Sequence, residues 1–221
     1  MSTLSTLNTA DRYAGDRAAA VTRLFDRLSG VYDTALVQSV MYRPPQDEII
    51  AELGRRRARR IADVGCGTGI LATRIWSELP VEVVYGCDAS EGMLAQARAR
   101  TDAVTWLLAR SEKLPLPDDS LDAVVSSHAF HFFDQPAALT EFHRVLAPGG
   151  CVIVVIVNPR TRFGSRMTSL STGRAGHFPD ERSMRRLMLD AGFATVDQRR
   201  VRRGSVGVLS PDLVTVAQVA P

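Results

Sequence analysis

The sequence predicts an α/β fold in which a doubly wound, mostly parallel sheet of seven strands forms a single domain over residues 1–221. Three observations support this prediction. Apolar runs of strand length alternate with segments of helical periodicity from Arg60 onward, three alternating glycines follow the first run, and a helical segment at residues 1–55 precedes it. Parallel strands joined by helices produce this alternation, and the helices then cover both faces of the sheet.

The first 55 residues are expected to form a helical cap or lid. Helical periodicity covers Arg17–Leu28, and a second, shorter helix is expected over Asp33–Met41. The pair Pro44-Pro45 then opens a third helix over Gln46–Leu53.

Strands and helices alternate through the next part of the chain, a cofactor-binding core at residues 60–157. The expected strands are Arg60–Val64, Val81–Cys87, Val104–Ala109, Leu121–Ser126 and Cys151–Val157. The expected helices between them are Ile70–Leu79, Glu91–Arg100 and Pro136–Val145. Residues 158–178 are expected to be an irregular insertion. Residues 180–221 supply the last elements, which are the helix Asp180–Ala191 and the strands Thr195–Val201 and Leu213–Val219.

The loop after the first strand combines glycines with the start of a helix. Gly65, Gly67 and Gly69 let the backbone turn tightly and approach a ligand, and the helix from Ile70 offers free amide donors. In a doubly wound sheet the binding crevice lies beyond the carboxyl ends of the strands, which is where this loop falls. A nicotinamide or flavin site would prefer G-x-G-x-x-G, whose last glycine would stand at Ile70, so the spacing argues against a dehydrogenase.

An acidic residue, Asp88, follows the second strand about 20 residues beyond the glycine loop, where it can accept hydrogen bonds from both ribose hydroxyls of an adenosine ligand. Ser90 is expected to cap the next helix, and Met93 in its first turn could lie against an adenine face. In the alternative interpretation, Asp88 is a turn acid and Met93 fills the core. Their joint spacing after the glycine loop favours the ligand.

Six segments of the chain occur in the order of a known set of motifs. They are Asp63–Gly69, Asp88–Leu94, Glu112–Asp118, Leu121–Val124, Ala129–Phe133 and Arg144–Gly150. Together they closely resemble the class I S-adenosylmethionine (AdoMet) methyltransferases, in the small-molecule branch near the ubiquinone- and menaquinone-type enzymes. The resemblance covers Arg60–Ala194.

This resemblance implies a Rossmann-like fold whose last strand is antiparallel, with AdoMet as cofactor and S-adenosylhomocysteine (SAH) as product. The glycine loop would hold the methionine end of AdoMet, Asp63 would order the contacts to its amino group, Asp88 would bind the ribose and Met93 the adenine. The implied cofactor-binding residues are Asp63, Gly65, Cys66, Gly67, Gly69, Asp88, Ala89, Met93, Ser111, Glu112 and Ser127.

One position departs from the family pattern. After the third strand the family commonly has Gly-Asp-Ala, whose acid accepts a hydrogen bond from the adenine amino group, whereas this chain has Ala109-Arg110-Ser111. Arg110 cannot accept that bond. Either the backbone around Ser111 and Glu112 takes over this contact, or the adenine pocket is altered.

Three residues are candidates for the catalytic step, which aligns an acceptor with the methyl group and needs a base only if the acceptor loses a proton. His128 and His131 lie in the loop expected to border the methyl group, where backbone carbonyls near Ser127 would face the cationic cofactor. Either histidine is a candidate base, although a structural role is favoured for His131. Tyr32 resembles the tyrosine of the family's lid, and packing of a helix on the sheet is its equally weighted alternative.

The insertion and the N-terminal cap are expected to wall the acceptor site. The insertion contains Arg160, Arg162, Arg166 and His177, and arginines there could clamp an anionic acceptor or simply face solvent. The leading hypothesis is methylation of a small apolar, aromatic, lipid or quinone-like molecule. An RNA or protein methyltransferase and a nonenzymatic binding module on the same scaffold are the alternatives.

The charge pattern argues against nucleic acid as a partner. The chain has 27 basic and 24 acidic residues, and every basic residue except Lys113 is an arginine. Arginines cluster at Arg55–Arg60 and Arg199–Arg203, but the acids nearly cancel them, whereas nucleic-acid domains usually gather unbalanced positive charge. Both clusters are expected on surfaces away from the cofactor loops.

Cysteine spacing and hydropathy indicate the compartment. Cys66, Cys87 and Cys151 show no paired spacing, so reduced thiols are expected and no metal site. No apolar run reaches the roughly 18 to 20 residues of a transmembrane helix, and residues 1–20 lack the apolar core of a secretory signal. A cytoplasmic location is expected, and the oligomeric state stays open.

Overall fold

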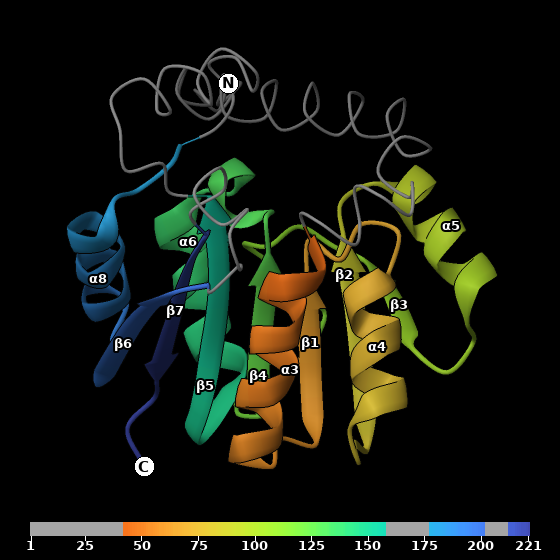
Figure 1. Cartoon of the computed structure of the whole chain (residues 1–221), viewed down its shortest axis with the longest axis horizontal. Coiled ribbons are helices and arrows are strands. Elements are labelled where there is room, and N and C mark those ends of the chain that lie inside the picture. Colours follow the sequence, from red (N-terminus) through yellow and green to blue (C-terminus); the bar gives the residue numbers. More distant parts are fainter. Residues whose placement is uncertain (1–41, 158–176, 202–211) are drawn as a thin grey trace, which may run out of the picture.

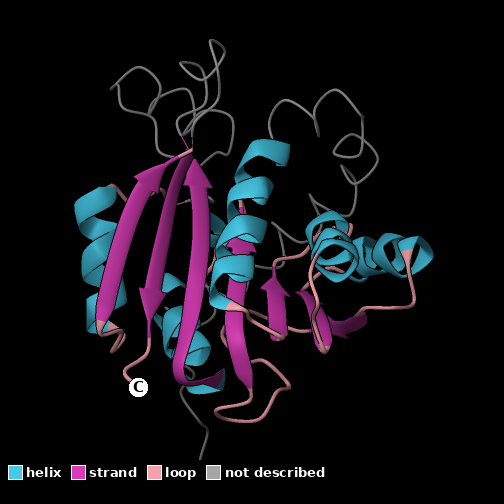
Figure 2. Ribbon diagram, turned by 60° about the horizontal axis from the view of Figure 1, so that its bottom comes forward, coloured by secondary structure: helices cyan, strands magenta, loops and turns pink. Residues whose placement is uncertain are grey.

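The computed structural model describes residues 42–157, 177–201 and 212–221. Its seven strands form one sheet in the order β3-β2-β1-β4-β5-β7-β6 (Figures 1 and 2). Every neighbouring pair is parallel except the two that involve β7, which runs antiparallel to β5 and to β6. The strand order reverses between β1 and β4, and in such sheets the crevice beyond the strand ends lies at this point.

The strand bounds follow the predicted runs closely. The strands are β1 (Arg60–Val64), β2 (Val83–Asp88), β3 (Thr105–Leu108), β4 (Leu121–Ser127), β5 (Leu146–Val157), β6 (Thr195–Arg200) and β7 (Asp212–Gln218). The largest difference is in β5, which was expected to start at Cys151. Leu146 already pairs with Leu121, and a register shift separates this pair from the next one, Ala123 with Cys151. Glycine and proline are uncommon inside strands, so the proline and two glycines between these pairs gave no sequence signal that the strand begins at Leu146.

Five α-helices and one 3-10 turn connect the strands in the described residues. They are α3 (Arg43–Arg56), α4 (Ile70–Glu78), α5 (Glu91–Arg100), η2 (Phe130–Phe132), α6 (Gln135–Val145) and α8 (Glu181–Asp190). Side chains cap three of them, because Ser90, Asp134 and Asp180 each accept a hydrogen bond from a backbone N–H three residues later. None of these helices is long and apolar enough to cross a bilayer.

The sheet is buried on both faces, which explains its nearly continuous apolar strands. On one face, Ile49 and Leu53 of α3 and Ile75 of α4 pack on the strands. On the other face, Phe142 of α6 and Met184 of α8 do so. Figure 1 shows α3 and α4 in front of the sheet and α6 behind it. The predicted doubly wound α/β fold with an antiparallel last strand is therefore confirmed, while the helices expected at 17–28 and 33–41 lie outside the described residues.

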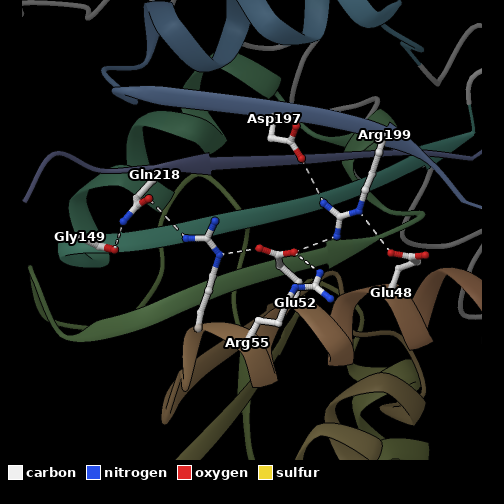
Figure 3. Close-up of polar contacts among 8 residues, drawn as sticks. Glu48, Glu52, Arg55, Gly149, Asp197, Arg199 and Gln218 are labelled. Carbon is white, nitrogen blue, oxygen red and sulfur yellow. Dashed lines mark hydrogen bonds and ion pairs between the residues drawn. The ribbon is translucent and has the colours of Figure 1, made fainter.

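A charged cluster ties α3 to the far edge of the sheet (Figure 3). Glu52 of α3 accepts hydrogen bonds from Arg55, from Arg56 at 2.7 Å and from Arg199 of β6 at 2.9 Å. Arg199 also reaches Glu48 at 3.3 Å. Burial alone would raise the pKa of Glu52, but these arginines lower it to about 2. The carboxylate is thus charged, paired and mostly buried at neutral pH.

We expect Glu52→Gln to lower the free energy of unfolding by about 1–3 kcal/mol at pH 7, because it removes a mostly buried carboxylate that three partly exposed arginines share. Since the pKa of Glu52 is depressed to about 2, its contribution is complete above the unfolded value of 4.5 and is lost as the pH falls from there toward 2. Urea unfolding at pH 7, 4 and 3 measures the difference from wild type, which should shrink with pH.

The matched control is Glu82→Gln, which removes a solvent-exposed ion pair with Arg59. We expect it to change the free energy of unfolding by less than about 0.5 kcal/mol. A loss at Glu52 no larger than this, or one that stays constant down to pH 3, would contradict the role assigned to the cluster.

Candidate functional site

The loop between β1 and α4 lies at the carboxyl edge of the sheet, where the sequence places the site. The amides of Gly65 and Cys66 both donate to the carbonyl oxygen of Cys87 in β2, at 2.8 and 3.1 Å. The amide of Gly67 donates to the Asp88 carboxylate at 2.8 Å. The loop is therefore fastened along its length to the end of the neighbouring strand.

The three glycines of this loop have different reasons to be glycine. All have positive φ, at +73° for Gly65, +55° for Gly67 and +80° for Gly69. A Cβ on Gly65 would lie 2.3 Å from Cβ of Ala129, and one on Gly69 would lie 2.4 Å from the Trp106 ring. A Cβ on Gly67 would meet no atom within 4 Å. Two of the glycines thus serve packing, and Gly67 is the one whose backbone borders open space.

Asp88 and its neighbours occupy the predicted place at the end of β2. One Asp88 oxygen accepts from Gly67 and the other from the Ser90 amide at 2.9 Å. Ser90 caps α5 as predicted, since its Oγ accepts from the Met93 amide at 3.1 Å. Ala89 is exposed, whereas the side chain of Met93 is buried. The predicted adenine contact of Met93 stays a prediction.

Asp63 is a buried carboxyl group at the end of β1. It is 1% exposed, and its Oδ2 has no hydrogen-bond partner. Burial and the nearby Asp88 charge raise the pKa of Asp63 to about 7, against the opposing hydrogen bond from the Ala72 amide. A buried carboxyl oxygen without a partner is costly, so a ligand group that donates to it would be stabilised.

In the segment after β3, the side chain of Arg110 forms an ion pair with Glu112. Its guanidinium Nε lies 3.0 Å from Glu112, and the side chain is more than half exposed. Glu112 also accepts from Ser111 Oγ at 3.0 Å and from the Asp134 amide at 3.2 Å. These hydrogen bonds outweigh burial and lower the pKa of Glu112. Arg110 is therefore turned toward a neighbouring acid on the surface.

His128 follows β4 in a backbone conformation that is rare for a residue with a side chain, with φ +58°. Its Nδ1 lies 3.0 Å from Ser127 Oγ, and its Nε2 lies 3.4 Å from Oδ1 of Asp212 in β7. The ring of Tyr42 packs edge-on against it, with centroids 5.1 Å apart. Two predicted site residues, Ser127 and His128, thus come together with an acid that the sequence did not single out.

His131 has a different environment. The ring is stacked on Phe178 and tilted against Phe132, with centroids 4.5 and 4.1 Å away. Burial, with a smaller contribution from His128, lowers the pKa of His131 to about 3. It is therefore neutral at physiological pH, and its buried Nδ1 has no partner. This environment favours the structural role of His131.

The end of the insertion is fixed to this edge of the sheet. The His177 amide donates to the carbonyl oxygen of His131 at 2.8 Å, and Gln135 Nε2 donates to the carbonyl oxygen of His177 at 2.8 Å. His177 Nδ1 lies 2.9 Å from Gln135 Oε1. Tyr32 and the arginines of the insertion, Arg160, Arg162 and Arg166, lie outside the described residues.

Sequence reasoning missed several residues that shape the site. Asp212, Gln135, Phe178 and Trp106 all contact predicted site residues or the glycine loop. The available signals were weak. Asp212 precedes an apolar strand and Gln135 opens a helix, which are ordinary places for polar residues, and Trp106 is one apolar residue of a strand.

Comparisons with known proteins agree with this geometry. Residues 62–154 match the family model described as a methyltransferase domain. The malonyl-[acyl-carrier protein] O-methyltransferase of Serratia marcescens is 36% identical over 61% of this chain and 51% of its own length. The ubiquinone/menaquinone biosynthesis C-methyltransferase of Paracoccus denitrificans is 26% identical over 86% of this chain and 88% of its own. The chain thus spans about half the length of the first relative.

Solved structures share the fold. Magnesium protoporphyrin IX methyltransferase from Synechocystis, with bound SAH, superimposes with a TM-score of 0.70 at 18% identity, over 92% of this chain and 100% of that one. These matches confirm the resemblance inferred from the motifs, and the seven-stranded α/β fold is that of solved methyltransferases.

We expect Gly65→Ala to lower the free energy of unfolding by about 2–4 kcal/mol, because its Cβ would overlap Ala129 and its φ is positive. The matched control is Gly149→Ala, with φ +77° and no atom within 4 Å of the new Cβ. The control should cost only about 1 kcal/mol. Urea unfolding of both variants measures this, and equal losses would contradict the close approach at Gly65.

We expect Asp63→Asn to stabilise the ligand-free protein at pH 8, on the order of 2 kcal/mol, because the charged carboxylate is buried. A raised pKa of about 7 means that the folded state binds the extra proton. Wild-type stability therefore falls as the pH rises from about 4 to about 7, and the advantage of the variant grows over that range. Unfolding at pH 5 and 8, with exposed Asp102→Asn as control, measures it. An advantage independent of pH would contradict the assigned environment.

Proposed function

We propose that this chain, whose residues 62–154 form a methyltransferase domain, transfers a methyl group from AdoMet to a small-molecule acceptor. The observation that carries the proposal is the partnerless Oδ2 of Asp63, buried beside a glycine loop. This acid and Asp88 place negative charge at the edge where a cationic sulfonium with an ammonium group would bind.

The residues present fit such a cofactor. Asp63 would accept from the amino group or a bridging water, which would supply the partner that its Oδ2 lacks. Gly67 leaves room for close approach of the backbone. Asp88 would exchange a backbone hydrogen bond for ribose hydroxyls. The predicted contacts of Cys66, Ala89, Met93, Ser111 and Glu112 belong to this proposal.

The chemistry that AdoMet supplies is a methyl group on a sulfonium, which an acceptor displaces in line. The chain's own task is to orient the two reactants and exclude water. Phe133 contributes to exclusion, since its ring lies against Gly65 of the glycine loop and packs edge to face on Phe130, with centroids 5.9 Å apart. We place Ser127 and His128 at the boundary of the methyl group.

A small acceptor group is supported by the names of the similar proteins, which concern malonyl-[acyl-carrier protein], ubiquinone/menaquinone biosynthesis and magnesium protoporphyrin IX. The segment Ser126–Ala129 differs from the N-P-P-Y-type tetrapeptide expected of base amino-group methylators. Most of the described arginines of the basic clusters also have acidic partners, as Arg60 does in Asp122 and Arg199 in Glu52. These observations disfavour the RNA alternative. The expected cytoplasmic location stays a prediction.

The nonenzymatic alternative rests on Arg110, because an arginine cannot accept a hydrogen bond from an adenine amino group. Its ion pair with Glu112 turns the guanidinium to the surface, so a basic residue at this position does not by itself block an adenine. The hypothesis of a degraded scaffold therefore loses its main support.

Calorimetric titration of the full chain with AdoMet and with SAH tests the proposal. We expect both to bind, and Asp88→Ala to weaken both by about tenfold or more, because a partly buried hydrogen-bonding carboxylate is lost. Asp102→Ala, an exposed acid at the opposite end of α5, is the matched control and should bind as wild type does. Absence of binding to both ligands would contradict the enzyme, and wild-type affinity in Asp88→Ala would contradict the ribose assignment alone.

A further inference from the structure

Ser127, His128 and Asp212 form a continuous polar chain across three strands of the sheet. Ser127 Oγ lies 3.0 Å from Nδ1 of His128, and Nε2 of the same ring lies 3.4 Å from Asp212 Oδ1. Ser127 ends β4 and Asp212 begins β7, with β5 between these strands (Figure 1). The histidine therefore bridges two strands that do not pair.

The imidazole is held from several sides. The His128 amide donates to the carbonyl oxygen of Val155 in β5 at 2.9 Å, which fixes the left-handed backbone. Tyr42, immediately before α3, packs edge-on against the ring. A strained conformation persists only where its surroundings impose it, and such residues gather at functional sites.

The partners of the ring determine which nitrogen carries the proton. Asp212 is fully buried, and its carboxylate can only accept when ionised, so Nε2 of His128 donates to it. Nδ1 is then free to accept, and Ser127 Oγ–H is the donor beside it. Asp212 thus holds the tautomer that makes Nδ1 a base.

We propose that Asp212 is a positioning residue for His128, and that His128 and Ser127 accept the proton of a neutral hydroxyl acceptor, such as a phenol or enol, during methyl transfer. This inference rests on the proposed function and names its acceptor class. Carboxylates and thiolates need no base, so a built proton path is expected only where the acceptor must lose a proton.

The acceptor proton reaches His128 through the Ser127 hydroxyl. The acceptor hydroxyl gives its proton to Ser127 Oγ while the serine proton moves to Nδ1 of His128, which becomes an imidazolium paired with Asp212. The acceptor oxygen gains the methyl group, and the electron pair of the broken carbon–sulfur bond stays on sulfur. The positive charge of the sulfonium is thus transferred to His128, and solvent takes the proton after product release.

His128 begins the segment that lies against the cofactor loop, as a proton path for methyl transfer requires. Ala129 and Phe133, in the segment that follows His128, lie against Gly65 of the cofactor loop. Among the described residues, the ionisable groups that face His128 are Asp212 from β7, Tyr42 before α3 and His131 from η2. His131 is neutral and packs on Phe178 and Phe132, whereas His128 has a carboxylate beside Nε2 and the Ser127 hydroxyl beside Nδ1.

The hydrogen bond can be observed without any acceptor. In the full-length protein at low temperature, we expect a proton NMR signal of His128 Nε2–H downfield of the amide region, because a carboxylate accepts the bond. It should disappear in His128→Gln and move toward the amide region in Asp212→Asn, while Asp197→Asn, an exposed acid of β6, leaves it unchanged. A signal that Asp212→Asn does not alter would overturn the pair.

The role of His128 as a base is tested in an activity assay with labelled AdoMet and two panels of acceptors. One contains phenols, enols and hydroxyquinones, and the other contains carboxylates and thiolates. We expect transfer to a hydroxyl compound, slowed about 100-fold or more in His128→Gln, as for loss of a general base. Asp212→Asn should slow it about tenfold and move the acidic limb of the pH–rate profile to lower pH, since the imidazolium loses its anion. His143→Gln in α6 is the matched control.

Three outcomes would overturn the inference while leaving the methyltransferase intact. They are transfer confined to carboxylates and thiolates, full rate in His128→Gln, and AdoMet binding with no transfer to any hydroxyl compound. If Asp212→Asn does not fold, Ser127→Ala carries the test, with a slowed rate and a retained Nε2–H signal expected. Asp212→Asn should bind AdoMet within about twofold of wild type, and a wild type that does not bind AdoMet contradicts the proposed function itself.

Discussion

The missing side chain at Gly65 is the constraint on which the site depends. The loop after β1 and the segment after β4 approach until a single added carbon would lie 2.3 Å from Ala129. This contact positions the two loops with respect to each other. One carries the Gly67 amide that donates to Asp88, and the other begins at His128, directly after Ser127. The buried Asp63 precedes the first of these loops, near the end of β1. Packing at one glycine therefore sets the distance between the two halves of the site.

Much of this architecture could be predicted from the sequence, because local patterns determine it. The alternation of strands and helices gave the sheet, Ser90 marked the start of α5, and the glycine spacing located the binding edge. These features depend on residues close together in the chain. The antiparallel last strand came from the resemblance to a family and not from the apolar pattern of β7.

Contacts between distant residues could not be predicted in the same way. Asp212 lies 84 residues from His128, and Arg199 lies 147 residues from Glu52. Nothing in the neighbourhood of either acid distinguishes it from an ordinary surface carboxylate. The pKa values of Asp63 and His131 likewise depend on burial, which the fold creates from several elements at once. The direction in which Arg110 turns follows from the placement of Glu112.

The hydrogen bonds at His177 have a consequence for how such a chain can change. They fix the residue that follows 158–176, and β5 fixes the residue that precedes this segment. With both ends held at the same edge of the sheet, closing a longer segment would cost only about 0.6 kcal/mol for each doubling of its length. Selection could therefore change the length or composition of this segment without disturbing the glycine loop. Such changes would leave the rest of the scaffold constant.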